Sequence, residues 1–319
     1  MPADGGHAYK SRHADQRSSA DADDAEMLAL RFGSALVDDG TYDDLVAGAM
    51  EDFEPTPDGD VDVDFSVRDV AEDTATGRTQ EMVDRRIALM GDDYPFSLET
   101  NRLTWGQSSS GLYEFLLAAS WKTDISSKPF NAIPQVFERV VAALSVTLLG
   151  LGAKAVHVGH PRDDAVGKSF KEAVEHLHSL TNEWPWRPDE ELPPDGPPSG
   201  DDGLDFVTWL AADGARDGRL FLLGQCACGD DWVGKLSDID LDFVGQWTGQ
   251  AWRVRPTKVF ATPHVVADGH FVRAQKKAGI ILDRVRLCSL ASTERGAEAI
   301  APFRENMAEL TKLVIESAG

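Results

Sequence analysis

From residue 130 onward, short apolar runs alternate with stretches of helical spacing, and this alternation constrains the fold more than any other feature of the sequence. Pro134 suits the first turn of a helix, and Gly150 and Gly152 follow its last apolar residues. The expected helices cover residues 134–149, 167–182, 232–247 and 271–278. The expected strands cover residues 155–158, 204–210, 219–227 and 257–261, with a last one running from 279 into 284–290. This order predicts an α/β core over residues 130–290, with a mixed central sheet flanked by helices.

The two ends of the chain differ from this core. Residues 1–25 are mainly Ser, Asp, Ala and Gly, so we expect a disordered acidic tail there. Residues 26–125 are expected to form a helical N-terminal region for packing or for contact with other subunits. Its helices are expected over 27–37, 42–50, 66–90 and 110–121. Residues 291–319 are expected to form a C-terminal helix, whose apolar stripe either completes the core or joins a homodimer.

Several classes of protein lose support from the sequence. The longest apolar stretch, residues 140–151, contains Ser145, Thr147 and Gly150 and is shorter than the roughly 20 residues of a membrane span. The N-terminus lacks the basic and apolar segments of a secretory signal, and 3 cysteines are too few for a disulfide scaffold. Fingerprints for acyl transfer, NTP hydrolysis and dinucleotide binding are also missing. We therefore expect a cytoplasmic protein without a membrane partner.

Charge is distributed unevenly along the chain. The formal net charge is −23, and residues 1–100 contribute 25 acidic side chains against 8 Lys and Arg. Residues 253–286, in contrast, contain eight Lys and Arg and only two acids, Asp268 and Asp283. Such an island is expected of a surface that contacts nucleic-acid phosphates, although a scatter of solvated charges would have the same composition. The candidate contacts are Arg273, Lys276, Lys277, Arg284 and Arg286.

Oxygen-bearing side chains occur where two of the expected strands would meet. Asp205 opens one apolar strand and Gln225 lies near the end of the next, so a hairpin would bring them to one end of the sheet. The Asp205 carboxylate, the Gln225 amide and a backbone carbonyl at Cys226 are hard oxygen donors that suit Mg²⁺, with Mn²⁺ as an alternative. Glu138 on the preceding helix would add a further oxygen. The alternative for Gln225 is an amide that is hydrogen-bonded within the core. The alternative for Glu138 is a carboxylate on the solvent-exposed face of its helix.

These residues resemble the motifs of a nuclease family. The helix that carries Phe137-Glu138, the segment Gly203-Leu204-Asp205 and a strand ending in Gln225 are similar to the PD-(D/E)xK superfamily, closest to Mrr-like restriction endonucleases with Gln in the last motif. The resemblance covers residues 130–290. It implies a restriction-endonuclease-like core and a Mg²⁺-dependent DNA endonuclease in restriction or anti-phage defence. It also implies that Asp205 is the central metal ligand, Gln225 the second motif residue and Glu138 the helix acid.

One motif position departs from this family. The lysine that should follow Gln225 by two residues is replaced by Ala227, and Lys235 on the next expected helix is the candidate to replace it as the residue that handles the attacking water. A catalytically silent module that binds nucleic acid or assembles with partner subunits is the alternative. A second alternative is an interaction protein whose acidic helical half is the working surface. An active nuclease with a displaced lysine requires Asp205, Gln225 and Lys235 to converge.

Overall fold

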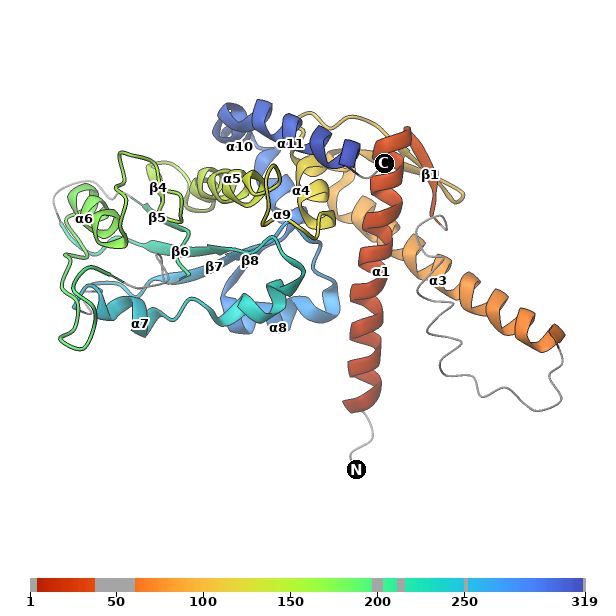
Figure 1. The fold of residues 1–319 in the computed structure, drawn as a ribbon, viewed down its shortest axis with the longest axis horizontal. Coiled ribbons are helices and arrows are strands. Elements are labelled where there is room, and N and C mark those ends of the chain that lie inside the picture. The colour runs from red at the N-terminus through yellow and green to blue at the C-terminus, as the bar shows by residue number, and fades with distance from the viewer. Residues whose placement is uncertain (1–4, 38–60, 197–202, 211–215, 250–251, 318–319) are drawn as a thin grey trace.

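A five-stranded sheet, in the order β4-β5-β6-β7-β8, forms the centre of the α/β core (Figure 1). Strands β4 (Ala153–His157), β5 (Phe206–Leu210) and β6 (Phe221–Cys226) are antiparallel, and β7 (Thr257–Ala261) and β8 (Ile280–Leu282) extend the sheet in parallel to β6. The predicted mixed sheet is therefore confirmed. The computed structural model describes residues 5–37, 61–196, 203–210, 216–249 and 252–317.

Helices cover both faces of this sheet (Figure 1). Helix α5 (Ala132–Leu149) lies on one face. The other face is covered by α6 (Phe170–Thr181), the 3₁₀ segment η3 (Asp230–Ser237), α7 (Leu241–Gln246) and α8 (Asp268–Ala278). The sequence predicted one helix over 232–247, but the structure divides it into η3 and α7, because Asp240 caps a new helix by accepting from the Asp242 and Phe243 N–H groups.

Side chains of the strands alternate between these two layers. Phe206 and Leu222 pack in the cluster that contains α5, whereas Val207 and Leu223 pack with α6. In the described part of the chain, α5 is the one helix long and apolar enough to cross a membrane. Its apolar face is buried in this cluster, as in the core helix of a globular domain.

The chain ends in helices, with two changes from the prediction. The last strand stops at Leu282, and α9 (Arg284–Ala291) follows at once because Asp283 caps it by accepting from the Arg286 N–H. The predicted terminal helix is divided into α10 (Glu294–Ile300), the 3₁₀ segment η4 (Ala301–Phe303) and α11 (Arg304–Ser317). Pro302 lies within η4, at the junction of the two helices.

The N-terminal region contains both helices and a small sheet. Its helices are α1 (Gly5–Phe32), α3 (Val61–Met90) and α4 (Leu112–Trp121), with the 3₁₀ turn η2 (Gly91–Asp93) after α3. Strands β1 (Ser34–Leu36), β2 (Phe96–Glu99) and β3 (Arg102–Trp105) form an antiparallel sheet in the order β1-β3-β2, which the sequence did not predict.

Three further predictions about this region meet different outcomes. The prediction of a disordered tail over residues 1–25 is wrong from residue 5 onward, because α1 begins there. The second half of α1 packs against the molecule through small side chains such as Ala22 and Ala25, both fully buried. The predicted helix over 27–37 ends at Phe32, and the one over 42–50 lies outside the described residues.

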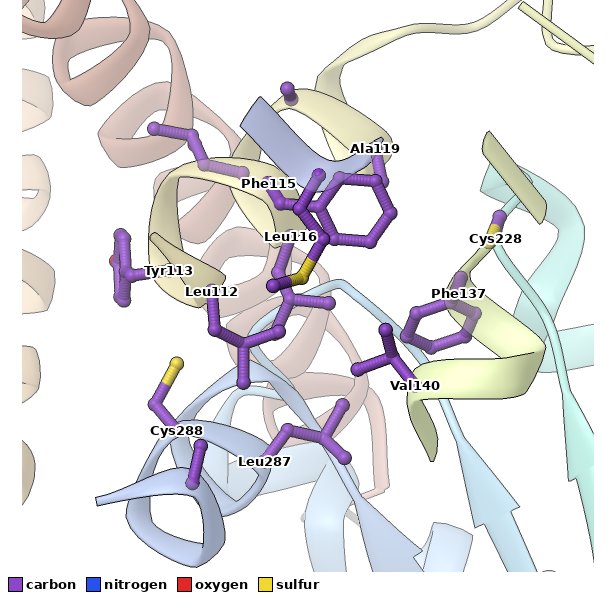
Figure 2. Close-up of a cluster of buried hydrophobic side chains, with 14 of the residues drawn as sticks. Leu112, Tyr113, Phe115, Leu116, Ala119, Phe137, Val140, Cys228, Leu287 and Cys288 are labelled. Carbon is purple, nitrogen blue, oxygen red and sulfur yellow. The ribbon is translucent and has the colours of Figure 1, made fainter. Parts of the chain in front are cut away.

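One hydrophobic cluster joins the N-terminal region to the α/β core (Figure 2). Figure 2 shows Leu112 and Leu116 of α4 facing Phe137 and Val140 of α5, with Leu287 of α9 beside them. The two predicted regions therefore share a continuous apolar interior.

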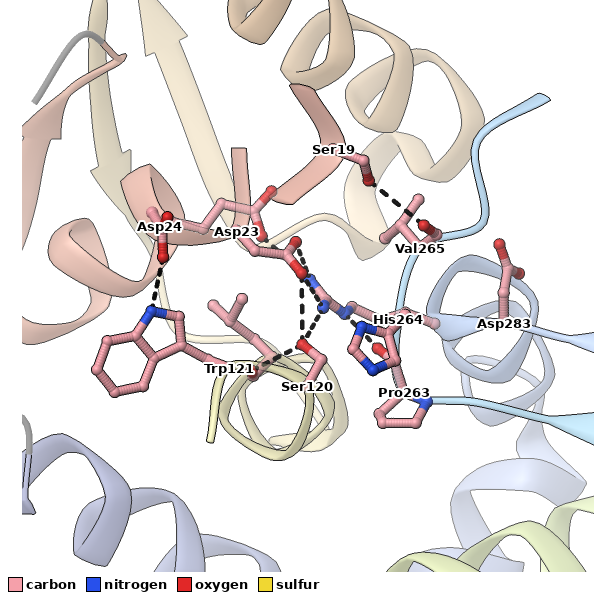
Figure 3. A network of polar contacts seen from close by, with 12 residues as sticks. Ser19, Asp23, Asp24, Ser120, Trp121, Pro263, His264, Val265 and Asp283 are labelled. Carbon is pink, nitrogen blue, oxygen red and sulfur yellow. Dashed lines mark hydrogen bonds and ion pairs between the residues drawn. The ribbon is translucent and has the colours of Figure 1, made fainter. Parts of the chain in front are cut away.

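A buried ionic cluster, made of Asp23, Glu26, Arg86 and Arg284, reinforces this junction. Figure 3 shows the surroundings of Asp23, with Ser120 of α4 beside it. Arg86 Nη1 lies 2.7 Å from Asp23 Oδ1 and 2.6 Å from Glu26 Oε1. Arg284 donates to the two Asp23 oxygens at 2.9 and 2.8 Å and also to Ser120 Oγ at 2.5 Å. Two carboxylates and two guanidinium groups thus neutralise one another between α1, α3 and α9.

The cluster controls the protonation of Asp23. Burial by itself would raise the pKa of this carboxyl group, but the charges of Arg284 and Arg86 outweigh burial and hold the pKa at about 2. For Arg284, burial would lower the pKa of the guanidinium, and the charge of Asp23 more than compensates. Asp23, Arg86 and Arg284 therefore carry charge at neutral pH.

Candidate functional site

Asp205 comes directly before β5, and its backbone is bonded to the neighbours on both sides. Its N–H donates to the Gly224 carbonyl at 2.9 Å, and its carbonyl accepts from the Val158 and Gly159 N–H groups at 2.7 and 2.9 Å. Its carboxylate Oδ2 accepts from the Cys226 N–H at 2.6 Å, and the residue is only 9% exposed. The ends of β4 and β6 therefore fix this carboxylate at one end of the sheet.

Glu138 and His157 lie beside it as a hydrogen-bonded pair. Glu138 is carried by α5 and His157 is the last residue of β4, which pairs antiparallel with β5 at Phe206. His157 Nε2 lies 2.9 Å from Glu138 Oε2, and both side chains are largely buried. The other ring nitrogen, Nδ1, is buried and has no hydrogen-bond partner among the described residues.

Gly159 is the point at which these groups converge. A Cβ atom built on this glycine would lie 2.9 Å from Asp205 Oδ1, 2.9 Å from Glu138 Oε2 and 3.2 Å from His157 Nε2. Three donor atoms from α5, β4 and the start of β5 thus surround the space that a side chain at Gly159 would occupy. The structure brings together two of the predicted metal ligands, Asp205 and Glu138, and adds His157, which the sequence analysis missed.

Gln225 is directed elsewhere. Its Nε2 donates to Asp238 Oδ2 at 2.9 Å, and its partner on β7 is Phe260, which packs with η3 and α8. Because successive side chains of a strand point to opposite faces, Cys226 and not Gln225 faces the α5 layer, where Glu138 lies. The structure therefore does not place the Gln225 amide with the two carboxylates.

Lys235 does not converge with them either. Its ammonium pairs with Asp231 at 3.3 Å, one helical turn earlier, and these side chains are 41% and 71% exposed. Ala227, which takes the motif position of the lysine, is buried in the apolar cluster beneath η3 and α8.

Two thiols lie near the carboxylates. Burial raises the pKa of Cys226 well above its usual value, and the charges of Asp205 and Glu138 raise it further. Burial and the same two carboxylates act in the same direction on the pKa of Cys228. Both thiols are therefore protonated at neutral pH, so the Cys226 contribution visible in the structure is its backbone N–H, which orients Asp205.

The predicted phosphate-contacting surface is smaller than the sequence indicated. Arg284 is fully buried in the ionic cluster, which corrects its prediction as a DNA contact: its charge is neutralised by Asp23 from α1. Arg286 is exposed, with its guanidinium over the Phe271 ring and one bond to the Ile281 carbonyl. The exposed cations of α8 are Arg273, Lys276 and Lys277.

The residues at Gly159 are suited to a divalent cation, although they are not arranged as ligands as they stand. In the parts of the chain that the structure describes, no three His, Cys, Asp or Glu side chains are positioned to hold a metal. Glu138 and Asp205 nevertheless offer two carboxylates around a space without a side chain. Mg²⁺ commonly uses only one or two protein carboxylates and takes its other ligands from water and substrate phosphates.

The comparisons with known proteins add little to this geometry. No protein-family model matches the chain, and no curated protein matches it. The structure of the MspJI restriction endonuclease in complex with a 27-mer oligonucleotide is similar over 57% of this chain and 35% of that chain, with 12% sequence identity and a TM-score of 0.25. A similarity at this level carries no argument about function.

Proposed function

We propose that this protein is a metal-dependent nuclease that hydrolyses phosphodiester bonds of DNA at the site around Gly159. The observation that carries the proposal is the convergence of Glu138 Oε2 and Asp205 Oδ1 on the space beside Gly159. Each oxygen lies 2.9 Å from the Cβ position of Gly159, so both carboxylates would attract a cation placed there.

Each group of the chain has a task in this proposal. A bound Mg²⁺ or Mn²⁺ would lower the pKa of a water molecule and neutralise charge on the phosphate. Glu138 and Asp205 would hold the ion, and the Cys226 N–H would keep Asp205 oriented. The exposed cations of α8 would contact backbone phosphates, which positions a duplex without reading its sequence. A restriction-endonuclease-like core and a role in defence against foreign DNA belong to the same proposal.

A catalytically silent module is the second candidate, and a specific observation favours it. Ala227 replaces the motif lysine, and Lys235 pairs with Asp231 instead of approaching the carboxylates. Such a module would keep the DNA-contacting surface, or bind partner subunits through the N-terminal region, without needing a metal.

Cleavage of supercoiled plasmid in the presence of Mg²⁺ or Mn²⁺ separates the two candidates. We expect nicking or linearisation by the wild type, and a loss of roughly 100-fold or more in Asp205→Asn and Glu138→Gln, since metal-held charge contributes several kcal/mol to such reactions. Asp163→Asn, which alters an exposed carboxylate paired with Arg139, is the matched control and should cleave normally. Plasmid binding without cleavage at any metal concentration would favour the silent module.

A further inference from the structure

We propose that a cavity between the small N-terminal sheet and α9 binds an alkylamine, that is, a hydrocarbon chain that carries one or more ammonium groups. This cavity shares no lining residue with the site around Gly159. The proposal therefore goes beyond the proposed function and is tested separately from it.

The cavity has the size of a small-molecule pocket. Its volume is about 440 Å³, and ligand pockets commonly measure roughly 300–1,000 Å³. It lies between η2 with the start of β2, the loop 106–110 after β3, and α9. Pro95, Phe96 and Cys288 are buried and supply apolar surface to its lining. A hydrocarbon chain would therefore find contacts there.

The charge of the lining favours a cation. Asp92 and Asp93 line the cavity, whereas no Lys, Arg or His of the described residues does so. Asp92 is exposed and Asp93 is half-buried. Neither carboxylate forms an ion pair or a hydrogen bond with another described residue. Both are therefore available to accept hydrogen bonds from a ligand.

A third carboxylate lies behind the loop 106–110. Glu114 of α4 is 5% exposed, and it accepts from the Ser108 N–H at 2.8 Å, from the Ser108 hydroxyl at 2.5 Å and from Trp105 Nε1 at 3.4 Å. These donors are neutral, and within the described ranges no Lys or Arg forms an ion pair with Glu114. Its negative charge is thus held close to the cavity by groups that do not cancel it.

The Cys288 thiol registers this negative charge at the cavity wall. Burial is the main reason that the pKa of Cys288 is raised. The charge of Arg284 opposes this effect, and the charges of Glu114 and Asp93 add to it. Carboxylates from two sides of the cavity therefore act on the same lining atom.

The loop before α4 has a feature that is also typical of anion sites, because serine hydroxyls and N–H groups at a helix N-terminus bind phosphate in many proteins. Here the chain itself occupies these donors. The Gly111 N–H donates to Ser108 Oγ at 2.9 Å. The Leu112 N–H donates to Ser110 Oγ at 3.2 Å. A phosphate in the cavity would lack these donors and would face carboxylates without a basic side chain.

The oxygen atoms of the lining suit an ammonium group better than a metal ion. In the segments that the structure describes, no three His, Cys, Asp or Glu side chains are positioned to hold a metal. An ammonium group needs only two or three oxygen acceptors and no closed coordination shell. Asp92, Asp93, Ser97 and Ser109 offer such acceptors, since none of these side chains has a hydrogen-bond partner among the described residues.

Calorimetric titration of the full-length protein with spermidine tests the proposal. We expect one site, with an affinity that falls as salt is added. Asp93→Asn should weaken binding at least about tenfold, since hydrogen bonds to charged groups contribute a factor of this size. Ser97→Lys should abolish binding, because it brings a competing ammonium group to the lining. Glu99→Gln is the matched control: it removes one exposed acid at the other end of β2, outside the cavity, and should keep the affinity.

Each other outcome would overturn the proposal. The net charge of −23 attracts amines to the whole surface, so equal weakening by Asp93→Asn and Glu99→Gln would show counter-ion binding only. Displacement of spermidine by inorganic phosphate would assign the cavity to an anion, and displacement by equimolar Ca²⁺ would assign it to a metal. Absence of binding by folded wild type, or unchanged binding by folded Ser97→Lys, would exclude this cavity. Thermal melts confirm that each variant is folded.

Discussion

At Gly159, any side chain would compete for space with the Asp205 and Glu138 carboxylates. In Gly159→Ala the new methyl group would meet two oxygen atoms at 2.9 Å, and the longer Glu138 side chain can rotate away from it. We expect the fold to survive, with stability within about 1 kcal/mol of wild type, while metal affinity and cleavage are lost because the carboxylates separate. Calorimetry with Mn²⁺ and a thermal melt measure the two effects.

Gly224→Ala is the informative contrast. There the methyl group would lie 2.0 Å from the Phe206 ring, inside the apolar cluster of α5. Overpacking of this kind costs about 1–3 kcal/mol. This variant should therefore be less stable than wild type, while its folded form keeps the affinity for metal. If Gly159→Ala destabilised the protein as much as Gly224→Ala, the space at Gly159 would be a packing feature and not a binding site.

Lys235 provides a second test at the level of one residue. Because its ammonium pairs with Asp231 at the surface, Lys235→Ala should leave cleavage at the wild-type level and change stability by no more than about 0.5 kcal/mol. The rate of plasmid nicking is the measurement. A large loss of rate in a folded Lys235→Ala protein would show that the lysine reaches the site during the reaction, as the sequence predicted.

At the level of elements, the ionic cluster links α1 to α9 and makes the stability of the fold depend on pH. The pKa of Asp23 is about 2 in the folded protein, below the usual aspartate value near 3.9, so its contribution is complete above about pH 4 and is lost as the pH falls toward 2. The contribution is about 2.6 kcal/mol. Chemical denaturation of wild type and Asp23→Asn between pH 2 and pH 7 measures it as the difference between the two proteins. A constant difference across this range would contradict the assignment.

The exposed cations of helix α8 predict how DNA binding depends on salt concentration. The logarithm of the DNA-binding constant falls linearly with the logarithm of the salt concentration, with a slope of about −0.9 for each phosphate contact. If Arg273, Lys276 and Lys277 contact phosphates, changing all three to alanine should reduce the magnitude of this slope by as much as about 2–3. Fluorescence anisotropy of a labelled duplex measures this slope. Arg253→Ala with Arg255→Ala, which removes guanidinium groups paired with Asp217 and Asp242, should leave it nearly unchanged. Equal effects of the two sets would argue against α8 as the contact surface.

Elements with a strong apolar pattern could be predicted from the sequence, and weakly patterned ones could not. The apolar runs of β5 and β6 and the stripe of α5 indicated both the sheet and the approach of Glu138 to Asp205. Strands β1, β2 and β3 have three or four residues with mixed burial, too few to establish a period of two. Helix α1 looked disordered because its Ala and Ser side chains, which permit close packing, are also typical of disordered segments.

The candidate site was half predictable for a related reason. The position of Asp205 followed from the start of its strand, and that of Glu138 from its place on the helix before the sheet. The orientation of Gln225 depends on a shift of a single residue along β6, which reverses the face of every side chain. The sequence offered one signal for His157: it ends a strand at the same end of the sheet as Asp205. Its partnership with Glu138 required the crossing of α5 over β4, which no local pattern contains.

For the whole molecule, the shared interior predicts that the N-terminal region cannot be removed. Deleting residues 1–32 would take Asp23 and Glu26 away and leave Arg86 and Arg284 buried without counter-ions. Breaking buried pairs in this way costs about 3–5 kcal/mol each, against a total stability of about 5–15 kcal/mol, so we expect an insoluble or unfolded product. Soluble yield and circular dichroism are the measurements.

A shorter deletion is the control. Removing residues 1–17 stops before Ser18, one of the buried residues of α1, and should leave the ionic cluster and the fold intact. A folded, soluble protein lacking residues 1–32 would show that the α/β core is independent of α1. Loss of function on deleting residues 1–125 would not by itself reveal a working surface there, because the core would lose its support at the same time.

The neutral ionic cluster also bears on how chains of this kind can diverge. Its charges come from three helices, and Asp23 and Arg284 are separated by 261 positions in the sequence. A change in any one of the four leaves a charge stranded in the interior, whereas acids on the surface can be exchanged singly at little cost. Descendants of this protein should therefore inherit Asp23, Glu26, Arg86 and Arg284 as a unit, or exchange them together for apolar residues of similar volume.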